Sequence, residues 1–596
     1  MWDTRKVFRA ILFLAIAAQA ATTSQNNAPV CENTEEETYE TKASTFIQQR
    51  AVLQKQTAPS GEGGHVQTSN LCRFAKLDWN DLISDAHVQD QYIAATLRWD
   101  GKFASPGVGI SQNGLTKDHV RLNADGTIRY RAGYTAPSKE SLHLSMLAVV
   151  IDGASPLAWN FLIEDALARS ALTEEEKQIL SQDELKALAE TEARNRAERI
   201  IGEYERWREN CPGCGGFVNW AGVGDVGFIL PGASDGKVRR VPALDNGQMA
   251  WAMVALATVL EEKGHTALAA RYNAQVNAMK ASAGFLYVDS RKRKCYSTVN
   301  VKEKDKPVGE GVIKQKGGLR DPFEGELMIM FQTLLADGVA DNAKANRNLW
   351  RKVKRSVVVK EYSGPAVRHS NETLPKGPIT VQAGWRFSAH EQWKFLVLPY
   401  LDNDLARRVM QNAERARSWD ARLRALPGMM ASAYRPPKAA EPNPVYMDKL
   451  GVPSVSYGYT EPSEKDLVVS PYGVYPLIIA DRGTGLAWHK AMLARPKMQS
   501  QYGSVEASEA FPGVGSETRV AEILSWDTKV TTDLAMVGGT GSILRRFLQK
   551  EAGRYEKFLR IVSDQMAKFA ELKGEETPYA DPPADVPHSA SFANCS

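Results

Sequence analysis

Acidic side chains that stand beside glycines and aromatic residues are the best candidates for chemistry in this sequence. Residues 320–326 place three acids at the predicted start of a helix, Glu324 and Glu326 among them. Late in the chain, Glu506 follows a Tyr-Gly-Ser-Val segment, and Asp527 follows a tryptophan. Glycoside hydrolysis needs two such carboxyl groups: one protonates the leaving oxygen, and the other activates water or attacks directly.

Other segments combine aromatic rings with hydrogen-bonding groups. One segment holds Trp385 and His390, and another, Ser-Pro-Tyr-Gly, holds Tyr472. Sugar rings present apolar faces, so the clefts that bind them are usually walled with Trp and Tyr. His390 is expected to be a structural or substrate-contacting residue rather than a metal ligand.

Each acid also has a purely structural interpretation. Glu324 and Glu326 at a helix N-terminus favour the helix dipole and can serve only that purpose. Glu326 shares a helical face with Met330, which predicts an inward position where loss of solvent raises the pKa of a general acid. Asp527 can simply cap the helix that follows it, and Asp245 is open to the same interpretation.

Common catalytic signatures are absent from the sequence. It contains no HExxH, no GxSxG and no phosphate-binding Walker A motif. Gly222–Gly227 satisfies G-x-G-x-x-G, but no good helix follows it, and we interpret it as a loop. The nine histidines show no clustered ligand spacing, so neither a catalytic metal nor a cofactor is expected.

The elements that must position these residues are mainly helices. Turn signals and a short strand over 127–130 occupy the region near residues 95–135, and helical periodicity then dominates to about residue 570. One helix is predicted from Asp245 to Gly264, and another from Pro322 to Gly338. A count near twelve helices favours helical hairpins closed into an (α/α)6 toroid. A solenoid is the alternative, although the sequence has no fixed repeat period.

Composition sets the broad class. The chain has 596 residues, of which 43% are hydrophobic and 24% charged, with a net charge of +4. These values are ordinary for a globular protein and argue against wholesale disorder. The near balance of charge also argues against a nucleic-acid binder and against electrostatic attachment to a membrane. A monomer is expected.

The N-terminus resembles a secretory signal. Arg5, Lys6 and Arg9 precede a short apolar run, and Ala18-Gln-Ala20 supplies a cleavage site, which predicts a secreted, extracellular protein. The chain is therefore divided into a signal peptide (1–20), a polar linker or arm (21–65), one catalytic domain (66–573) and a disordered Pro-rich tail (574–596).

Secretion favours disulfide formation. The sequence has six cysteines: Cys31, Cys72, Cys211, Cys214, Cys295 and Cys595. An even number is expected to pair, and Cys211 with Cys214 reads as a structural disulfide in a Gly-rich turn. Asn371 and Asn594 begin glycosylation motifs, which matter only in a eukaryotic host.

Taken in order, five segments resemble a known family. They are Tyr130–Glu140, Leu244–Gln248, Phe323–Met328, Gly384–Trp393 and Pro471–Gly473. They look like the secreted endo-β-1,2-glucanases of the fungal glycoside hydrolase family one hundred and sixty-two and, more distantly, of the bacterial family one hundred and forty-four. The likeness spans roughly residues 95–570. It implies an (α/α)6 barrel that hydrolyses β-1,2-glucan within the chain, with inversion and without a metal.

The resemblance also implies roles for single residues. The family's general acid is a helix glutamate, which corresponds to Glu326, with Glu324 as the second choice. Its base is a late aspartate, which corresponds to Asp527, with Glu506 as a rival. Proton transfer through a substrate hydroxyl is implied too, so the two carboxyls need not be ~6.5–9.5 Å apart. A further set is implied to bind substrate: Asp245, Trp385, His390 and Tyr472.

Three other functions remain compatible with the sequence. A glucanase for another linkage would keep the fold. A polysaccharide lyase would favour a basic cleft, whereas these segments are richer in acids than in arginine. A non-catalytic carbohydrate-binding or cell-wall protein would not need to retain both Glu326 and Asp527.

Overall fold

The computed structural model describes most of the chain from residue 81 to residue 583. The exceptions are residues 231–237, 290, 293, 311, 315–316, 320–321, 337–341, 439–442, 449, 459–461 and 512–517. The predicted signal peptide and linker, Cys31, Cys72, Cys595 and Asn594 lie outside the described residues.

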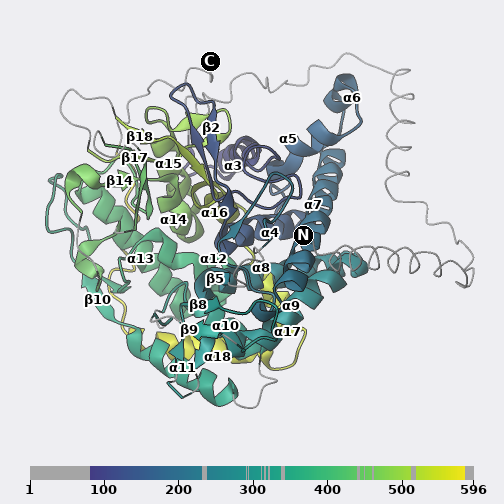
Figure 1. The fold of residues 1–596 in the computed structure, drawn as a ribbon. Helices are drawn as coiled ribbons and strands as arrows, with labels where there is room; N and C mark the ends of the chain where they lie inside the picture. Colours follow the sequence, from purple (N-terminus) through teal and green to yellow (C-terminus); the bar gives the residue numbers. More distant parts are fainter. Residues whose placement is uncertain are drawn as a thin grey trace, which may run out of the picture. The chain divides into compact units, whose positions relative to one another are not determined.

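Six helices form an inner ring (Figure 1). In chain order they are α4 (Pro137–Asp152), α8 (Ala243–Glu262), α10 (Glu326–Leu335), α12 (Trp393–Val397), α14 (Tyr475–Ala480) and α16 (Trp526–Met536). Neighbours in this order pack against each other from α4 to α8 to α10 and from α12 to α14 to α16, and α16 returns to α4. An ion pair between Glu326 Oε1 and Lys394 Nζ, 2.7 Å long, joins α10 to α12 and completes the ring.

An outer helix precedes each inner one in the sequence. The outer helices are α3 (Ala86–Gly101), α7 (Gln182–Asn210), α9 (Thr266–Tyr287), α11 (Asn342–Ser356), α13 (Asp404–Leu423) and α15 (Arg482–Leu493). Four more helices supplement them: α5 (Asn160–Arg169), α6 (Glu174–Gln178), α17 (Gly541–Gln549) and α18 (Arg554–Met566). Six outer–inner pairs confirm the predicted (α/α)6 toroid, and the predicted helices near 245–264 and 322–338 correspond to α8 and α10.

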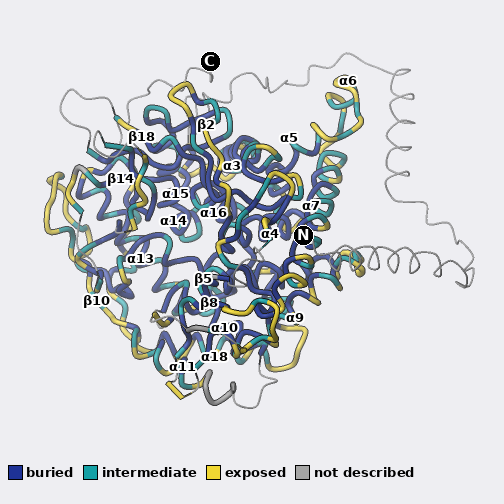
Figure 2. Tube along the Cα trace, in the orientation of Figure 1, coloured by how far each residue is buried: buried dark blue, intermediate teal, exposed yellow. Residues whose placement is uncertain are grey.

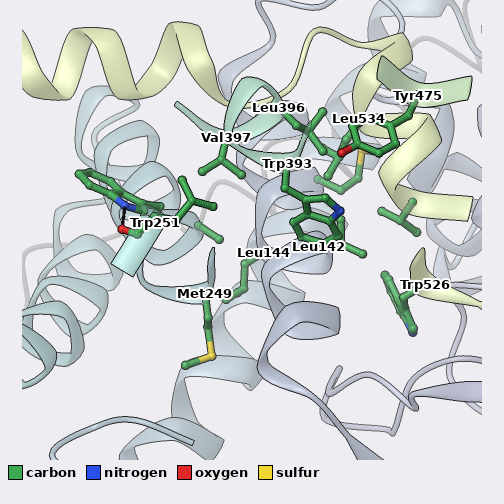
Figure 3. Close-up of a cluster of buried hydrophobic side chains, with 14 of the residues drawn as sticks. Leu142, Leu144, Met249, Trp251, Trp393, Leu396, Val397, Tyr475, Trp526 and Leu534 are labelled. Atoms are coloured by element: carbon green, nitrogen blue, oxygen red, sulfur yellow. Dashed lines mark hydrogen bonds between the residues drawn. The ribbon is translucent and has the colours of Figure 1, made fainter. Parts of the chain in front are cut away.

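The sequences of the inner helices explain their position. A helix that is apolar on every side is stable only when it is surrounded by protein. Nearly every residue of α8 and α10 is buried, and Figure 2 shows the inner helices in dark blue. Figure 3 shows side chains of five inner helices meeting in one cluster, which includes Trp251, Trp393 and Trp526.

Short antiparallel strands connect the helices. One group carries residues important below: β1 (His119–Leu122) between β2 (Ile128–Arg131) and β19 (Ile523–Ser525), β3 (Tyr134–Thr135) with β4 (Ala221–Gly222), and β12 (Ala433–Arg435) with β13 (Val445–Met447). The others are β5 (Val238–Pro242), β6 (Val288–Asp289), β7 (Lys294–Cys295), β8 (Thr298–Val301), β9 (Val312–Lys314), β10 (Val359–Tyr362), β11 (Ile379–Gln382), β14 (Val468–Val469), β15 (Gln499–Ser500), β16 (Gly503–Ser504), β17 (Ala507–Glu509) and β18 (Val520–Ala521). Strands therefore occur along the whole domain, and not only in the N-terminal segment where the sequence predicts them.

Residues 574–583 differ from the predicted disordered tail. Trp419 Nε1 of α13 donates to the Pro578 carbonyl at 2.8 Å, and Trp488 Nε1 of α15 donates to the Ala580 carbonyl at 2.7 Å. Two tryptophans on outer helices thus hold this Pro-rich segment by its backbone. Composition alone cannot anticipate such anchoring, because the donors lie far away in the sequence.

Two cysteines confirm the expected short-range pairing. Cys211 and Cys214 form a disulfide just after α7. Cys295 is buried on β7, where Gln332 Nε2 of α10 lies 4.0 Å from its Sγ, and its pairing stays a prediction. Asn371 is exposed, and its glycosylation stays a prediction. Within the described part of the chain, no helix is both long and apolar enough to cross a membrane.

The burial of one acid, Asp533, predicts that the free energy of unfolding depends on pH. Asp533, 0% exposed in α16, has no hydrogen-bond partner for either carboxylate oxygen among the described residues. Burial raises the pKa of Asp533 well above its usual value, and the charge of Asp100 raises it further while Lys529 opposes them. The protonated form therefore favours folding below the unfolded pKa of about 3.9, and that contribution is lost as the pH rises.

We expect Asp533→Asn to raise the free energy of unfolding by about 1–3 kcal/mol at pH 8, because the amide needs no ionisation. The gain should shrink at pH 5, where more of the native protein is protonated. Thermal unfolding at both pH values tests this, with Asp564→Asn on the exposed face of α18 as the control. An equal shift at both pH values would contradict the explanation.

Candidate active site

A cavity of about 430 Å³ lies where the inner helices begin. Each of the six contributes from its first turns or from the residues just before them. The lining consists of Asp118, Tyr134, Ala136, Ser138, Lys139, Trp220, Leu244, Asp245, Gln248, Glu324, His390, Trp393, Tyr434, Tyr446, Tyr472, Ser525 and Asp527. The N-terminal ends of all six inner helices thus surround one space.

This position has an electrostatic consequence. The N-terminus of a helix carries the positive end of its dipole, and its first amide groups have no partner within the helix. Six such ends favour negative charge at the cavity. Four carboxylates stand there, those of Asp118, Asp245, Glu324 and Asp527, together with one lysine, Lys139.

Glu324 is the glutamate that the structure brings into the cavity. It lies in the turn before α10, and Gln248 Nε2 of α8 donates to its Oε2 at 3.3 Å. Gly247 allows this approach, because a Cβ there would lie 2.6 Å from the backbone nitrogen of Met328. The close contact of α8 with α10 therefore fixes where the Glu324 carboxylate points.

Glu326, the sequence's first choice for the acid, does not line the cavity. It points inward, as its helical face predicts, but there it forms the ion pair with Lys394 and accepts from Gln565 Nε2 at 2.8 Å. Lys394 Nζ also donates to the Pro322 carbonyl at 2.7 Å, two residues before Glu324. Glu326 thus anchors the turn, and Glu324 is the residue with access to a ligand.

Asp527 lies in the first turn of α16 and lines the cavity. Ser525 caps this helix, since its Oγ accepts from the Thr528 amide at 3.2 Å, so Asp527 is not the cap. Lys139 Nζ of α4 donates to Asp527 Oδ2 at 2.6 Å and lies 3.9 Å from Asp118 Oδ1. Although burial opposes its charge, these two carboxylates raise the pKa of Lys139 well above its usual value.

Glu506, the rival for the base, lies behind Asp527 and outside the lining. Its Oε2 accepts from Ser525 Oγ at 2.5 Å and from Thr528 Oγ1 at 2.7 Å. Burial raises the pKa of Glu506, and these two hydrogen bonds oppose that rise. Glu506 therefore holds the start of α16, the turn from which Asp527 projects.

The pKa values of the other two acids of the cavity are shifted in opposite directions. Asp245 accepts from Trp220 Nε1 at 3.0 Å, and burial raises its pKa, with the charges of Asp527 and Asp118 adding to the effect. Burial acts in the same direction on Asp118, but Lys139 and a hydrogen bond from His119 more than offset it and lower its pKa. The cavity thus holds one acid with a raised pKa, Asp245, and one with a lowered pKa, Asp118.

Three of the four predicted substrate-binding residues line the cavity: Asp245, His390 and Tyr472. Burial, with help from nearby arginines, lowers the pKa of His390 to about 3, so the ring is neutral and serves as a hydrogen-bonding group. Trp393 Nε1 donates to Tyr472 Oη at 2.6 Å, which fixes two aromatic walls against each other. Trp385, the fourth, is half-exposed and lies outside the lining.

Several residues that line the cavity are not predicted as site residues from the sequence. They are Asp118, Tyr134, Lys139, Trp220, Gln248, Tyr434 and Tyr446. Most lie on or beside two-residue to four-residue strands, where periodicity carries no signal. Tyr134, Lys139 and Gln248 do fall inside the segments that carry the family resemblance, which is the one signal that points to them.

The arrangement of the ring separates two carboxylates. Glu324 precedes α10 and Asp527 begins α16, three places apart in a ring of six helices, so they face the cavity from opposite walls. Aromatic rings and hydrogen-bonding groups surround the space between them. Such a site can protonate one side of a bound bond and activate a nucleophile on the other.

Comparison with known proteins gives the site a context. The family model described as endo-beta-1,2-glucanase SGL matches residues 115–596. A solved structure of an endo-β-1,2-glucanase mutant from Talaromyces funiculosus in complex with β-1,2-glucan is 27% identical, with a TM-score of 0.75, and the match covers 89% of this chain and 100% of that one. A complex of endo-β-1,2-glucanase from the same organism with sophorose is 28% identical, with a TM-score of 0.74 and coverage of 88% and 99%. None of the curated protein sequences compared matches the chain.

The family match covers most of the domain that builds the cavity, and the structural matches extend over nearly the full length of both relatives. The chain is therefore a glycoside hydrolase that belongs to the endo-β-1,2-glucanase SGL family.

Proposed function

We propose that this protein is a secreted enzyme that hydrolyses internal β-1,2-glucosidic bonds of β-1,2-glucan with inversion of the anomeric configuration. The observation that carries the proposal is the pair of carboxylates, Glu324 and Asp527, which line one aromatic-walled cavity from inner helices three places apart in the ring. The related enzymes bound to β-1,2-glucan and to sophorose support the choice of linkage.

Glu324 is assigned as the general acid and Asp527 as the general base. Asp527 is suited to the base because it lines the cavity and a 2.6 Å ion pair with Lys139 fixes the position of its carboxylate. Glu324 is suited to the acid because it lines the cavity, where the neutral amide of Gln248 donates to its Oε2 at 3.3 Å and orients the carboxyl group. The related mutant crystallised with β-1,2-glucan carries glutamine in place of a glutamate, which is consistent with an essential glutamate.

The electrostatics of the cavity favour a neutral substrate. Lys139, the one lysine of the described lining, already forms an ion pair with Asp527 and lies 3.9 Å from Asp118, and His390 is uncharged, so no side-chain cation of the lining is left to bind an acidic polysaccharide. This argues against a lyase acting on acidic sugars. The two-carboxylate mechanism itself needs no cofactor.

Incubation with defined polymers tests the proposal. The purified protein is mixed separately with linear β-1,2-glucan, β-1,3-glucan, β-1,4-glucan and starch, and products are resolved by size. We expect oligosaccharides of several lengths from β-1,2-glucan alone, because internal cleavage releases intermediate sizes. Proton NMR of the first products should show the α-anomer before mutarotation. Glucose or a disaccharide as the sole product would contradict internal cleavage, and an initial β-anomer would contradict inversion.

Lys139 is predicted to support catalysis through its contacts with Asp527 and Asp118. Lys139→Met should lower kcat/KM by about 10²-fold, because Asp527 and Asp118 then lose their shared cation. The acidic limb of the pH–rate profile should also move to higher pH, since Lys139 lowers the pKa of Asp118, the carboxylate that shares this lysine with the assigned base. Lys139→Arg is the control that keeps the charge. An unchanged acidic limb in Lys139→Met would contradict this role.

Secretion and a monomeric state remain parts of the proposal. Expression of the full chain in a secreting host tests the first: we expect protein in the medium with Ala21 as its first residue. Retention inside the cell with an intact N-terminus would contradict it. Gel filtration coupled to light scattering tests the second.

A further inference from the structure

Two exposed aromatic side chains stand together outside the cavity. Trp385 is 50% exposed and Tyr457 is 41% exposed. Their ring centroids are 5.9 Å apart with an interplanar angle of 85°, so the rings form a corner. The five largest fully buried side chains of the described structure are all tryptophans, which makes an exposed pair with this geometry notable.

Trp385 lies flat on a glycine. A Cβ at Gly458 would lie 2.5–2.7 Å from three atoms of the indole, so only glycine leaves room for the ring. One face of the indole is thus packed on backbone, and the opposite face is left to solvent. A larger residue at position 458 would displace the Trp385 indole from this position.

The backbone beneath the pair is also fixed. The Tyr457 amide donates to the Gly384 carbonyl at 3.1 Å, and the Gly458 amide donates to the Trp385 carbonyl at 3.0 Å. The buried Glu391 carboxylate accepts from the Arg386 amide at 3.2 Å, which holds the residue that follows Trp385. A ring held in place before binding loses little conformational entropy when a ligand stacks on it.

The pair is connected to the wall of the cavity. Arg386 forms a 2.8 Å ion pair with Asp448, which comes two residues after the lining residue Tyr446. The same segment continues from Trp385 to His390, another lining residue, and the charges of Arg386 and Asp448 both act on the His390 ring. The segment that carries Trp385 therefore continues into the cavity lining at His390, and Arg386 links it to the segment that carries Tyr446.

We propose that Trp385 and Tyr457 form an accessory subsite that binds the β-1,2-glucan chain outside the catalytic cavity. This inference rests on the proposed function. A cavity of about 430 Å³ is the size of a site for one small ligand, so most of a polymer cut internally must lie outside it. The apolar face of a glucose ring matches the exposed face of the indole, and Tyr457 closes the corner from the side.

Kinetics with long and short substrates test the subsite. We expect Trp385→Ala to raise KM for long β-1,2-glucan by about fivefold to tenfold, the scale of one aromatic stacking contact, with kcat nearly unchanged. For the shortest β-1,2-glucooligosaccharide that the enzyme cleaves, both constants should stay within twofold of the parent protein. Tyr457→Ala should show the same pattern with a smaller effect. Phe285→Ala, which removes an exposed ring from α9, is the matched control.

Affinity electrophoresis in gels with β-1,2-glucan provides a readout independent of turnover. We expect retardation of the parent protein that weakens in Trp385→Ala and persists in Phe285→Ala. Equal KM values for parent and Trp385→Ala on the polymer, or equal losses on long and short substrates, would overturn the inference while leaving the proposed function intact. A parent protein that neither cleaves nor binds β-1,2-glucan would overturn both.

Discussion

Replacing Glu324 by glutamine is expected to lower kcat on β-1,2-glucan by about 10³-fold, within the range usual for loss of a general acid. Glutamine has nearly the same shape and can still hydrogen-bond Gln248, but it has no proton to give to the leaving oxygen. Substrate binding should therefore persist. Initial rates and calorimetric titration with a β-1,2-glucooligosaccharide measure the two properties separately. Loss of affinity equal to the loss of rate would contradict an acid and favour a binding role.

Glu326→Gln is the matched control, and we expect it to lower stability rather than kcat. It removes the negative partner of the buried Lys394, and an unpaired buried charge costs about 3–5 kcal/mol of stability. We expect a clear fall in melting temperature with kcat per folded molecule reduced far less than in Glu324→Gln. A stable but inactive Glu326→Gln beside an active Glu324→Gln would reverse the two assignments.

Glu324 and Glu326 show which features of the site can be predicted from the sequence and which cannot. The pattern around them predicts a helix start correctly, and the inward face of Glu326 is read correctly from its spacing to Met330. Periodicity applies only inside a helix, however, and Glu324 lies in the turn before it. Which carboxylate reaches the cavity depends on the contact of Gly247 with Met328, a pairing between distant parts of the chain.

The fold was more accessible to prediction than the site for a related reason. An apolar helix such as α8 can be recognised from its own residues alone. The alternation of inner and outer helices along the chain then gives six helical hairpins. Asp118 and Tyr446 have no comparable local pattern, because short strands bring them to the cavity. Asp245, His390 and Tyr472 became candidates through the family resemblance, and the structure places all three in the lining of the cavity, at or near the beginning of an inner helix.

Asp527→Asn is expected to lower kcat by about 10³-fold, because asparagine cannot accept a proton from the attacking water. The change keeps the size of the side chain, and Ser525 still caps α16, so the fold should be retained. Sodium azide should restore part of the rate. Azide is a nucleophile that needs no deprotonation, and Glu324 remains available to protonate the leaving group.

The configuration of the azide product tests the assigned role of Asp527. Attack from the wall of Asp527, opposite Glu324, converts the β-linked sugar to an α-glucosyl azide, which NMR distinguishes from the β-form. A β-glucosyl azide would indicate that azide attacks a covalent glucosyl-enzyme formed by another carboxylate, with Asp527 as the acid/base residue of a double displacement, and inversion would then be wrong. If Asp527 were itself the nucleophile, the azide product would also be α, and the β-anomer released first by the parent enzyme would reveal that case. Glu506→Gln and Asp118→Asn are the controls. Glu506 holds the start of α16 through Ser525 and Thr528, so its loss should lower stability and slow the reaction without rescue by azide. Azide rescue confined to Asp118→Asn would instead identify Asp118 as the base, because only the residue that activates water is bypassed by a nucleophile that needs no base.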